Sequence, residues 1–274
     1  MFRASLSYAV RRNRAVVAGG GLVLVTLPFA LAAAAEGRLR YLALLGLLPW
    51  LLLRGYYVRV IRTTVGRERP TLPPFDRPRR LLRDGLGSLV VAGCYLLPGA
   101  VVLGPLAYAR AVGTDVGTLV GGLPSPVADV AVSATGVVVV VALMYTLGAL
   151  YAIPVAVTRF AHADRLRAAF DLRRVVAGAL TEDYAVAWGI SMLLQALGFP
   201  LAYALRLLLV GFALHFVVGA AVRYCYGQGV GAGLGLSPVV PDPSPRSGRD
   251  DRRGRPADDD PARVRGADRE RERT

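Results

Sequence analysis

Two short segments of this chain hold the side chains best suited to bind an anion. Residues 73–86 read "PPFDRPRRLLRDGL" and residues 168–180 read "AAFDLRRVVAGAL", so each places Phe-Asp shortly before clustered arginines. A guanidinium group presents a planar fork of donors that fits phosphate and carboxylate oxygens. The candidate residues for an anionic lipid site or an interface are Arg79, Arg80, Arg83, Arg173 and Arg174.

The aspartates of the two segments stand where a helix would begin. Asp76 and Asp171 are candidate N-caps, because a carboxylate there accepts hydrogen bonds from free backbone N–H groups. Apolar residues recur behind each at helical spacing, opposite the arginines, which predicts two short amphipathic helices. We expect both helices to lie at the cytoplasmic membrane surface as structural anchors. The alternative is a paired basic site between them for an anionic lipid or solute.

The candidate polar residues of the long apolar stretch 184–226 are Arg206 and His215. An ionisable residue inside a membrane span is a candidate functional group. Arg206 is expected at a turn near the outer interface, where a charge is tolerated. His215 is expected to face the bundle interior as a neutral, hydrogen-bonded group, with proton or ligand handling as the alternative.

Catalytic chemistry has no recognisable arrangement of residues in this sequence. There is no Ser-His-Asp set, paired carboxylate site, Walker loop or zinc-ligand spacing, and only two cysteines and two histidines occur. We therefore expect no enzyme, no catalytic residue, no cofactor and no metal site.

The distribution of charge indicates the elements that carry these residues. The chain has 274 residues, of which 54% are hydrophobic and 19% charged, and the charges are concentrated between long apolar runs. About 20 apolar residues cross a bilayer core as a helix. The pattern predicts an all-α, polytopic membrane helical bundle with about six spans, at 15–35, 39–60, 86–108, 132–157, 184–203 and 206–226.

Two of these spans have competing interpretations. The run 15–35 could be a signal peptide, but it is long for a signal core and another apolar segment follows it. The stretch 184–226 could be one tilted helix with a re-entrant piece. At the end of the second span, Tyr56 and Tyr57 stand beside Arg54, Arg59 and Arg62, which predicts a belt of side chains at headgroup depth.

Arginine counts on the two sides predict the orientation. Six spans place both termini on one side, which carries four Arg in 1–14, eight in 59–83 and five in 159–174. Cytoplasmic loops are enriched in Arg and Lys. We therefore expect a multi-pass protein of the cell membrane with a cytoplasmic N-terminus (1–14), a membrane domain (15–236) and a cytoplasmic tail (237–274).

The tail is rich in Pro, Arg and Asp and almost free of apolar residues, so it is expected to be disordered. Its residues 246–273 hold ten Arg against eight acidic residues, which is not a basic nucleic-acid-binding arm. The expected partners are membrane lipids and a second copy or another membrane protein, and we do not expect nucleic acid.

The two Phe-Asp segments also suggest an internal duplication. Asp76 and Asp171 are 95 positions apart (171 − 76), with two predicted spans between them. An even number of spans keeps the two copies parallel rather than inverted. A parallel internal repeat is the prediction.

Six short motifs together resemble a known family. "GYYVRVIR", "PPFD", "DGL", "AAFDLRRV", "DYAVAW" and "YGQG" are similar to the domain of unknown function 4013 family, over roughly residues 40–233. The resemblance implies an integral membrane protein, mostly of haloarchaea and related archaea, with a retained first span. It implies no ligand and no catalytic residue.

Two functions remain from the sequence. The first is a structural or interaction component of the membrane, and the alternative is a transporter or permease component for a small solute or lipid. A transporter should have polar groups that meet in the interior near the midplane, whereas a scaffold should be a dry bundle of small residues.

Overall fold

The chain is described here in a computed structural model, which describes residues 1–10, 13–33, 37–114 and 124–239. Every regular element in these ranges is a helix. The α-helices are α1 (Phe2–Val10), α2 (Asn13–Ala33), α3 (Leu47–Thr64), α4 (Pro78–Ala111), α6 (Ser125–Ala163), α7 (Leu172–Ala179), α8 (Glu182–Ala204) and α9 (Val210–Gly233). Three short 3₁₀ helices are η1 (Gly37–Gly46), η2 (Leu166–Phe170) and η3 (Leu205–Leu208).

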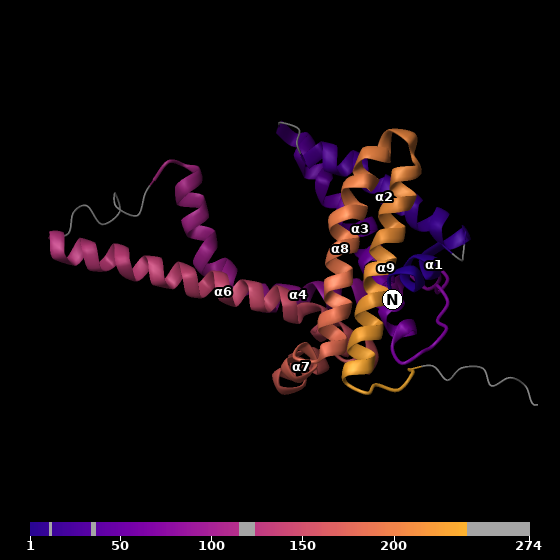
Figure 1. The fold of residues 1–274 in the computed structure, drawn as a ribbon. Helices are drawn as coiled ribbons and strands as arrows, with labels where there is room; N and C mark the ends of the chain where they lie inside the picture. Colours follow the sequence, from indigo (N-terminus) through magenta and orange to yellow (C-terminus); the bar gives the residue numbers. More distant parts are fainter. Residues whose placement is uncertain (11–12, 34–36, 115–123, 240–274) are drawn as a thin grey trace, which may run out of the picture. The chain divides into compact units, whose positions relative to one another are not determined.

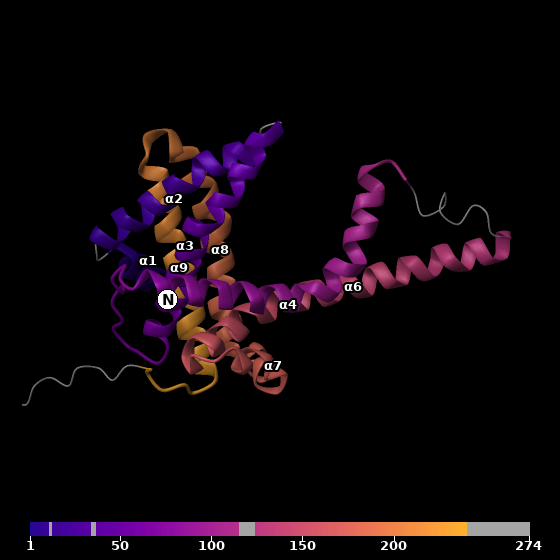
Figure 2. The ribbon, with the colours of Figure 1, turned by 180° about the vertical axis from the view of Figure 1, so that it is seen from behind.

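Helix α9 is the centre of the bundle. It runs beside α8 in both views (Figures 1 and 2) and also contacts α1, α2, α3, α6 and α7. Its glycines allow this close packing, since a Cβ at Gly219 would overlap the Tyr57 hydroxyl and one at Gly227 would overlap the Thr64 side chain. Small residues that let helices approach are typical of membrane bundles.

Helices α4 and α6 form the longest pair and pack along each other. Both are strongly apolar, and most of the valines and leucines of α6 face outward rather than into the protein. α4 changes direction along its length (Figure 1), and it contains Pro98 and Pro105, which remove backbone hydrogen bonds. Proline inside a helix and an outward apolar surface are both expected where lipid is the solvent.

The described residues contain five helices long and apolar enough to cross a membrane. They are Ala43–Thr64, Pro78–Ala111, Ser125–Ala163, Glu182–Leu208 and Val210–Gly233. The predicted class, an all-α polytopic membrane bundle, is confirmed. The predicted first span, 15–35, corresponds to α2, whose described apolar part (Asn13–Phe29) is shorter than a full span, and residues 34–36 lie outside the described ranges. The number of six spans therefore stays a prediction.

Several predicted boundaries differ from the observed helices. The segment at 76–89 is not a separate surface helix, because α4 continues from Pro78 through the whole predicted span 86–108 without interruption. No turn residue separates the two parts, so the backbone hydrogen bonds simply continue. The predicted span 39–60 begins as η1 before α3 takes over at Leu47. The stretch 184–226 forms two helices, α8 and α9, joined at η3.

The prediction that residues 237–274 are disordered falls almost entirely outside the described residues.

Candidate functional site

The end of α3 carries a buried cluster of charges. The Arg62 guanidinium donates through Nη1 to Asp84 Oδ2 at 2.8 Å, through Nη2 to Asp164 Oδ1 at 2.9 Å and through Nε to the Ala161 carbonyl at 2.8 Å. Arg62 is 8% exposed and Asp84 is 1% exposed. Charges this deeply buried are stable only when paired and hydrogen-bonded. The cluster therefore ties together α3, α4 and the end of α6.

Asp164 also forms ion pairs with two of the predicted lipid-binding arginines. Arg80 Nη2 lies 3.3 Å from Asp164 Oδ2, and Arg83 Nη2 lies 2.9 Å from Asp164 Oδ1. These guanidinium groups are partly neutralised within the protein. In the described part of the chain Arg79 is exposed and has no ion-pair partner, so it is the member of this segment most open to an external anion.

The second predicted segment forms the helix α7. Asp171 is its N-cap, and its Oδ1 accepts a hydrogen bond from the Arg174 backbone N–H at 3.3 Å. The Arg174 side chain reaches back to the same carboxylate, with Nε 3.5 Å from Oδ2. Arg173 is exposed and has no ion-pair partner among the described residues.

The prediction that Asp76 caps a helix is wrong. α4 begins at Pro78 with Arg77 as its N-cap, in a left-handed conformation and without a side-chain cap. The Asp76 carboxylate instead accepts a hydrogen bond from the Arg59 guanidinium. This contact lowers the pKa of Asp76 below its usual value.

The two Phe-Asp motifs share a different geometry. In each, the aspartate pairs with an arginine from the preceding long helix, Arg59 with Asp76 and Arg159 with Asp171 (3.4 Å). The phenylalanines also stack on tyrosines: Phe75 lies 3.8 Å from the Tyr56 ring, and Phe170 lies 6.1 Å from the Tyr95 ring. The likeness of the two ion pairs supports the predicted repeat, whereas the two tyrosines come from helices that are not equivalent, α3 and α4. The repeat stays a prediction.

The five arginines are not joined into one site. Arg80 and Arg83 share Asp164, whereas Arg174 pairs with Asp171. The helices that carry them share α6 as a neighbour, but α4 also packs on α3, and α7 also packs on α8 and α9. The structure thus gives no support to a single basic site shared by the two segments.

The predicted belt at headgroup depth is wrong for two of its members. Tyr56 is completely buried, with its hydroxyl donating to the Pro73 carbonyl at 3.0 Å. Arg62 is buried in the charge cluster described above. Phe75 of the 65–77 loop and Phe216 of α9 pack against Tyr56. Arg62 is held by groups of α4 and of the end of α6.

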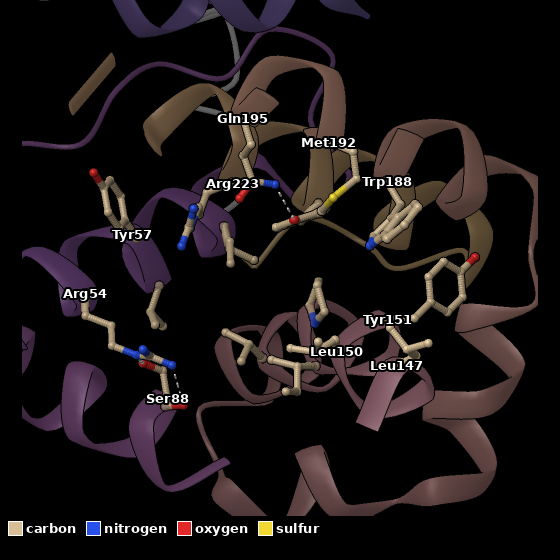
Figure 3. Close-up of a pocket in the computed structure, with 16 residues that line it drawn as sticks. Arg54, Tyr57, Ser88, Leu147, Leu150, Tyr151, Trp188, Met192, Gln195 and Arg223 are labelled. Atoms are coloured by element: carbon tan, nitrogen blue, oxygen red, sulfur yellow. Dashed lines mark hydrogen bonds between the residues drawn. The ribbon is translucent and has the colours of Figure 1, made fainter. Parts of the chain in front are cut away.

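A cavity of about 550 Å³ lies between five helices and contains polar groups that the sequence reasoning missed (Figure 3). α3, α4, α6, α8 and α9 all contribute side chains to it. Its volume is within the range of small-molecule sites, roughly 300–1,000 Å³. We call it the main cavity.

One wall of the main cavity is cationic. Arg54 donates through Nε to Ser88 Oγ at 2.9 Å and through Nη2 to the Ser88 carbonyl at 3.3 Å. The Arg223 guanidinium lies 4.7 Å from the centre of the Tyr57 ring. Both arginines are half-buried, and no Asp or Glu is among the residues that line the cavity. Within the described ranges neither has an acidic partner.

The opposite wall is apolar and aromatic. In Figure 3 Leu147, Tyr151, Trp188 and Met192 lie away from Arg54 and Arg223. Leu147, Leu150 and Met192 are also exposed on the outer surface of the bundle. Part of this wall of the cavity therefore belongs to the outer apolar surface of the bundle.

The cationic groups lie deep within the candidate spans. Arg54 is near the middle of Ala43–Thr64, Arg223 is near the middle of Val210–Gly233, and Gln195 is central in Glu182–Leu208. Gln195 Nε2 lies 3.4 Å from the Tyr226 hydroxyl, which also lines the cavity. Interior polar groups thus meet near mid-span.

Arg206 and His215 lie elsewhere, at the η3 end of the bundle. Arg206 is in η3, and its guanidinium stacks 3.8 Å from the centre of the Tyr203 ring. The His215 ring on α9 lies 4.8 Å from the ring of Phe199. The predicted turn at Arg206 is observed, while the expected hydrogen bond of His215 is missing at Nδ1.

The fold and these groups define a class: a multi-pass α-helical membrane protein with a cationic cavity at mid-span. The family described as "Protein of unknown function (DUF4013)" matches residues 39–222, which is more than half of the chain. The chain therefore belongs to this family, as the motifs predicted. The archaeal origin that the resemblance implied stays an expectation. Comparison with curated proteins and with solved structures finds no match.

Proposed function

We propose that this protein binds an anionic molecule with an apolar part, such as an anionic lipid, in the main cavity, as a component of transport or lipid handling across the membrane. The observation that carries this proposal is that Arg54 and Arg223 line the same cavity near mid-span. No Asp or Glu is among the residues that line this cavity. Inserting an arginine at the centre of a span costs about 2.5–3.5 kcal/mol on insertion scales. Hydrogen bonds to Ser88 and the ring of Tyr57 offset part of this cost, and a bound anion would offset more.

The distribution of polarity supports an amphiphilic ligand rather than a fully hydrated ion. A negative group would lie against the two guanidinium groups, and an apolar chain would lie against Leu147, Trp188 and Met192. Because this wall faces the bilayer, a lipid could enter sideways without first crossing water. No enzyme chemistry is part of the proposal.

The alternative proposal is a structural or interaction component of the cell membrane, with lipids, a second copy or another membrane protein as partners. The close glycine packing of α9 favours it, because much of this helix is buried and built from small residues. The polar cavity favours the first proposal, because a scaffold has no need of two unpaired cations at mid-span. In both proposals the termini face the cytoplasm.

Native mass spectrometry tests the lipid-binding proposal. The purified parent is offered phosphatidylglycerol and phosphatidylcholine with identical acyl chains. We expect a preference for phosphatidylglycerol that falls at least tenfold in an Arg54→Gln variant, because Arg54 lines the main cavity. Glutamine keeps a donor for Ser88, so the fold should survive.

The matched control is an Arg79→Gln/Arg173→Gln variant, which removes two exposed, unpaired cations and should keep the preference. If the preference is lost in the control and kept in the cavity variant, the surface segments are the lipid site. If the parent shows no preference, the proposal is wrong.

A further inference from the structure

A second cavity, of about 390 Å³, lies between α2, α3, α8 and α9, and η3 contributes Arg206 to its lining. Three cationic or potentially cationic side chains line it: Arg206, His215 and Arg223. No Asp or Glu is among its lining residues. It shares Tyr57 and Arg223 with the main cavity, so this pair forms a common wall.

Three buried polar atoms in the lining have no hydrogen-bond partner among the described residues. They are Arg206 Nε, His215 Nδ1 and the Tyr57 hydroxyl. An unsatisfied buried donor or acceptor costs about 1–3 kcal/mol, so native structures rarely keep three in one place without a ligand or water. The presence of three such atoms in one cavity is the first observation that indicates a ligand site.

The packing around these groups holds them in position. Arg206 is stacked between Tyr203 at 3.8 Å and Phe212 at 5.5 Å, measured from Cζ to the ring centres. His215 lies against Phe199 at 4.8 Å and edge-on to Tyr203 at 5.8 Å. Aromatic rings that fix the guanidinium and imidazole planes leave their N–H groups free for a ligand.

The lining fits one chemical class of ligand. Two guanidinium groups, an imidazole and a phenol supply donors from different helices, and the cavity offers no negative group to oppose an anion. Oxyanions such as phosphate accept several charge-assisted hydrogen bonds at once, which is where arginine is most effective. A cation would meet only like charge.

We propose that this second cavity binds a phosphate-type oxyanion between Arg206, His215 and Arg223, either as a free ion or as the head group of a phospholipid. The site shares Arg223 and Tyr57 with the main cavity, but Arg206 and His215 line only the second cavity. Because Arg223 and Tyr57 belong to both linings, occupation of one cavity should be felt in the other.

Thermal unfolding of the purified full chain tests this inference with inorganic phosphate as the probe. Phosphate is titrated against chloride at constant ionic strength, and the unfolding temperature is followed. We expect a saturable rise in the parent. Both Arg206→Gln and His215→Gln should weaken the apparent phosphate affinity at least tenfold, and the second variant keeps the test open if the first does not fold.

An Arg54→Gln variant separates this inference from the proposed function, because Arg54 lines only the main cavity. It should bind phosphate like the parent. If Arg54→Gln loses phosphate and Arg206→Gln keeps it, the main cavity is the phosphate site and the inference is overturned.

A second arm distinguishes the two sources of the oxyanion. If inorganic phosphate has no effect, phosphatidylglycerol in mixed micelles is titrated in its place. Stabilisation that Arg206→Gln removes and Arg54→Gln keeps would assign the site to a lipid head group. A parent that responds to neither probe shows that water satisfies these groups, and the inference fails.

Discussion

At the scale of single residues, two ion pairs of the same kind differ in their surroundings. Asp84 is 1% exposed and pairs with the buried Arg62, whereas Asp76 is 49% exposed and pairs with Arg59 near the surface. Burial decides what each pair contributes, because water screens a surface pair and competes for its hydrogen bonds. The same substitution at the two positions therefore separates a structural pair from a marginal one.

We expect Asp84→Asn to destabilise the protein strongly. Removing one partner of a buried ion pair typically costs about 3–5 kcal/mol. Asparagine keeps a neutral acceptor and Asp164 still pairs with Arg62, so we expect the free energy of unfolding to fall by about 2–3 kcal/mol. The measurement is an unfolding titration with a denaturing detergent in mixed micelles.

Asp76→Asn is the matched control, with an expected loss below about 1 kcal/mol at pH 7. Arg59 lowers the pKa of Asp76 in the folded state, so this pair stabilises the protein above the unfolded pKa of about 3.9. Its contribution is lost as the pH falls through the lower, folded pKa. The difference between parent and Asp76→Asn should therefore shrink below about pH 4. Equal losses at both positions would show that Asp84 is not structurally special.

At the scale of elements, α7 has two apolar faces rather than one. Val175 and Ala179 are buried against the bundle, while Leu172, Val176 and Leu180 are exposed. A short helix with exposed leucines next to arginines is typical of the membrane interface.

We expect the exposed apolar side chains of α7 to enter the headgroup region. Spin labels are placed at Leu172, Val176 and Leu180 in a Cys94→Ser/Cys225→Ala background, with Ala177 on the arginine face as the control position. The three labels should be more accessible to oxygen than to a water-soluble nickel chelate, and the control label should show the reverse. Equal exposure to the chelate at all four positions would place α7 away from the bilayer.

Local sequence patterns predict where a helix such as α7 forms. They do not predict which residues from distant parts of the chain come into contact. The apolar periodicity of residues 172–180 and the cap at Asp171 depend on neighbouring residues, so α7 could be predicted from the sequence. The Arg62 cluster joins residues 22 and 102 positions apart, and no short-range pattern encodes such contacts.

The main cavity was missed for the same reason. The tyrosines and arginines that follow Arg54 closely in sequence predict a position at the membrane interface. Arg223 lies in the stretch 184–226, whose candidate residues are Arg206 and His215. Only the packing of α3 beside α9 brings Arg54 and Arg223 to one cavity. The available signal was an arginine inside a predicted span, since Arg54 lies within 39–60 and Arg223 within 206–226.

At the scale of the whole membrane unit, contacts at one end of the bundle constrain the topology. The Tyr8 ring of α1 lies 4.9 Å from Tyr224, in the C-terminal half of α9. A Cβ at Gly231 would lie 3.1 Å from the Gly66 nitrogen, just beyond the end of α3. The N-terminal helix, the end of α3 and the end of α9 thus lie at the same end, so α2 must lead the chain to the other end.

This arrangement makes six crossings the expected topology, with α2 as the first. Single cysteines at Ser7 (α1), Thr71 (the loop before α4) and Leu207 (η3) test it in the cysteine-free background, since all three positions are exposed. In intact cells a membrane-impermeant maleimide should label position 207, and positions 7 and 71 should react only after permeabilisation.

Two other labelling patterns would contradict this expectation in different ways. If positions 7 and 71 react on opposite sides, α2 does not cross, since α3 alone would then separate them. If positions 7 and 71 react from outside and 207 only after permeabilisation, six crossings hold but the arginine-rich loops face outward, against the charge rule. In that case the end of the bundle that carries η3, and with it the second cavity, would face the cytoplasm. The oxyanion would then come from the cytoplasmic pool.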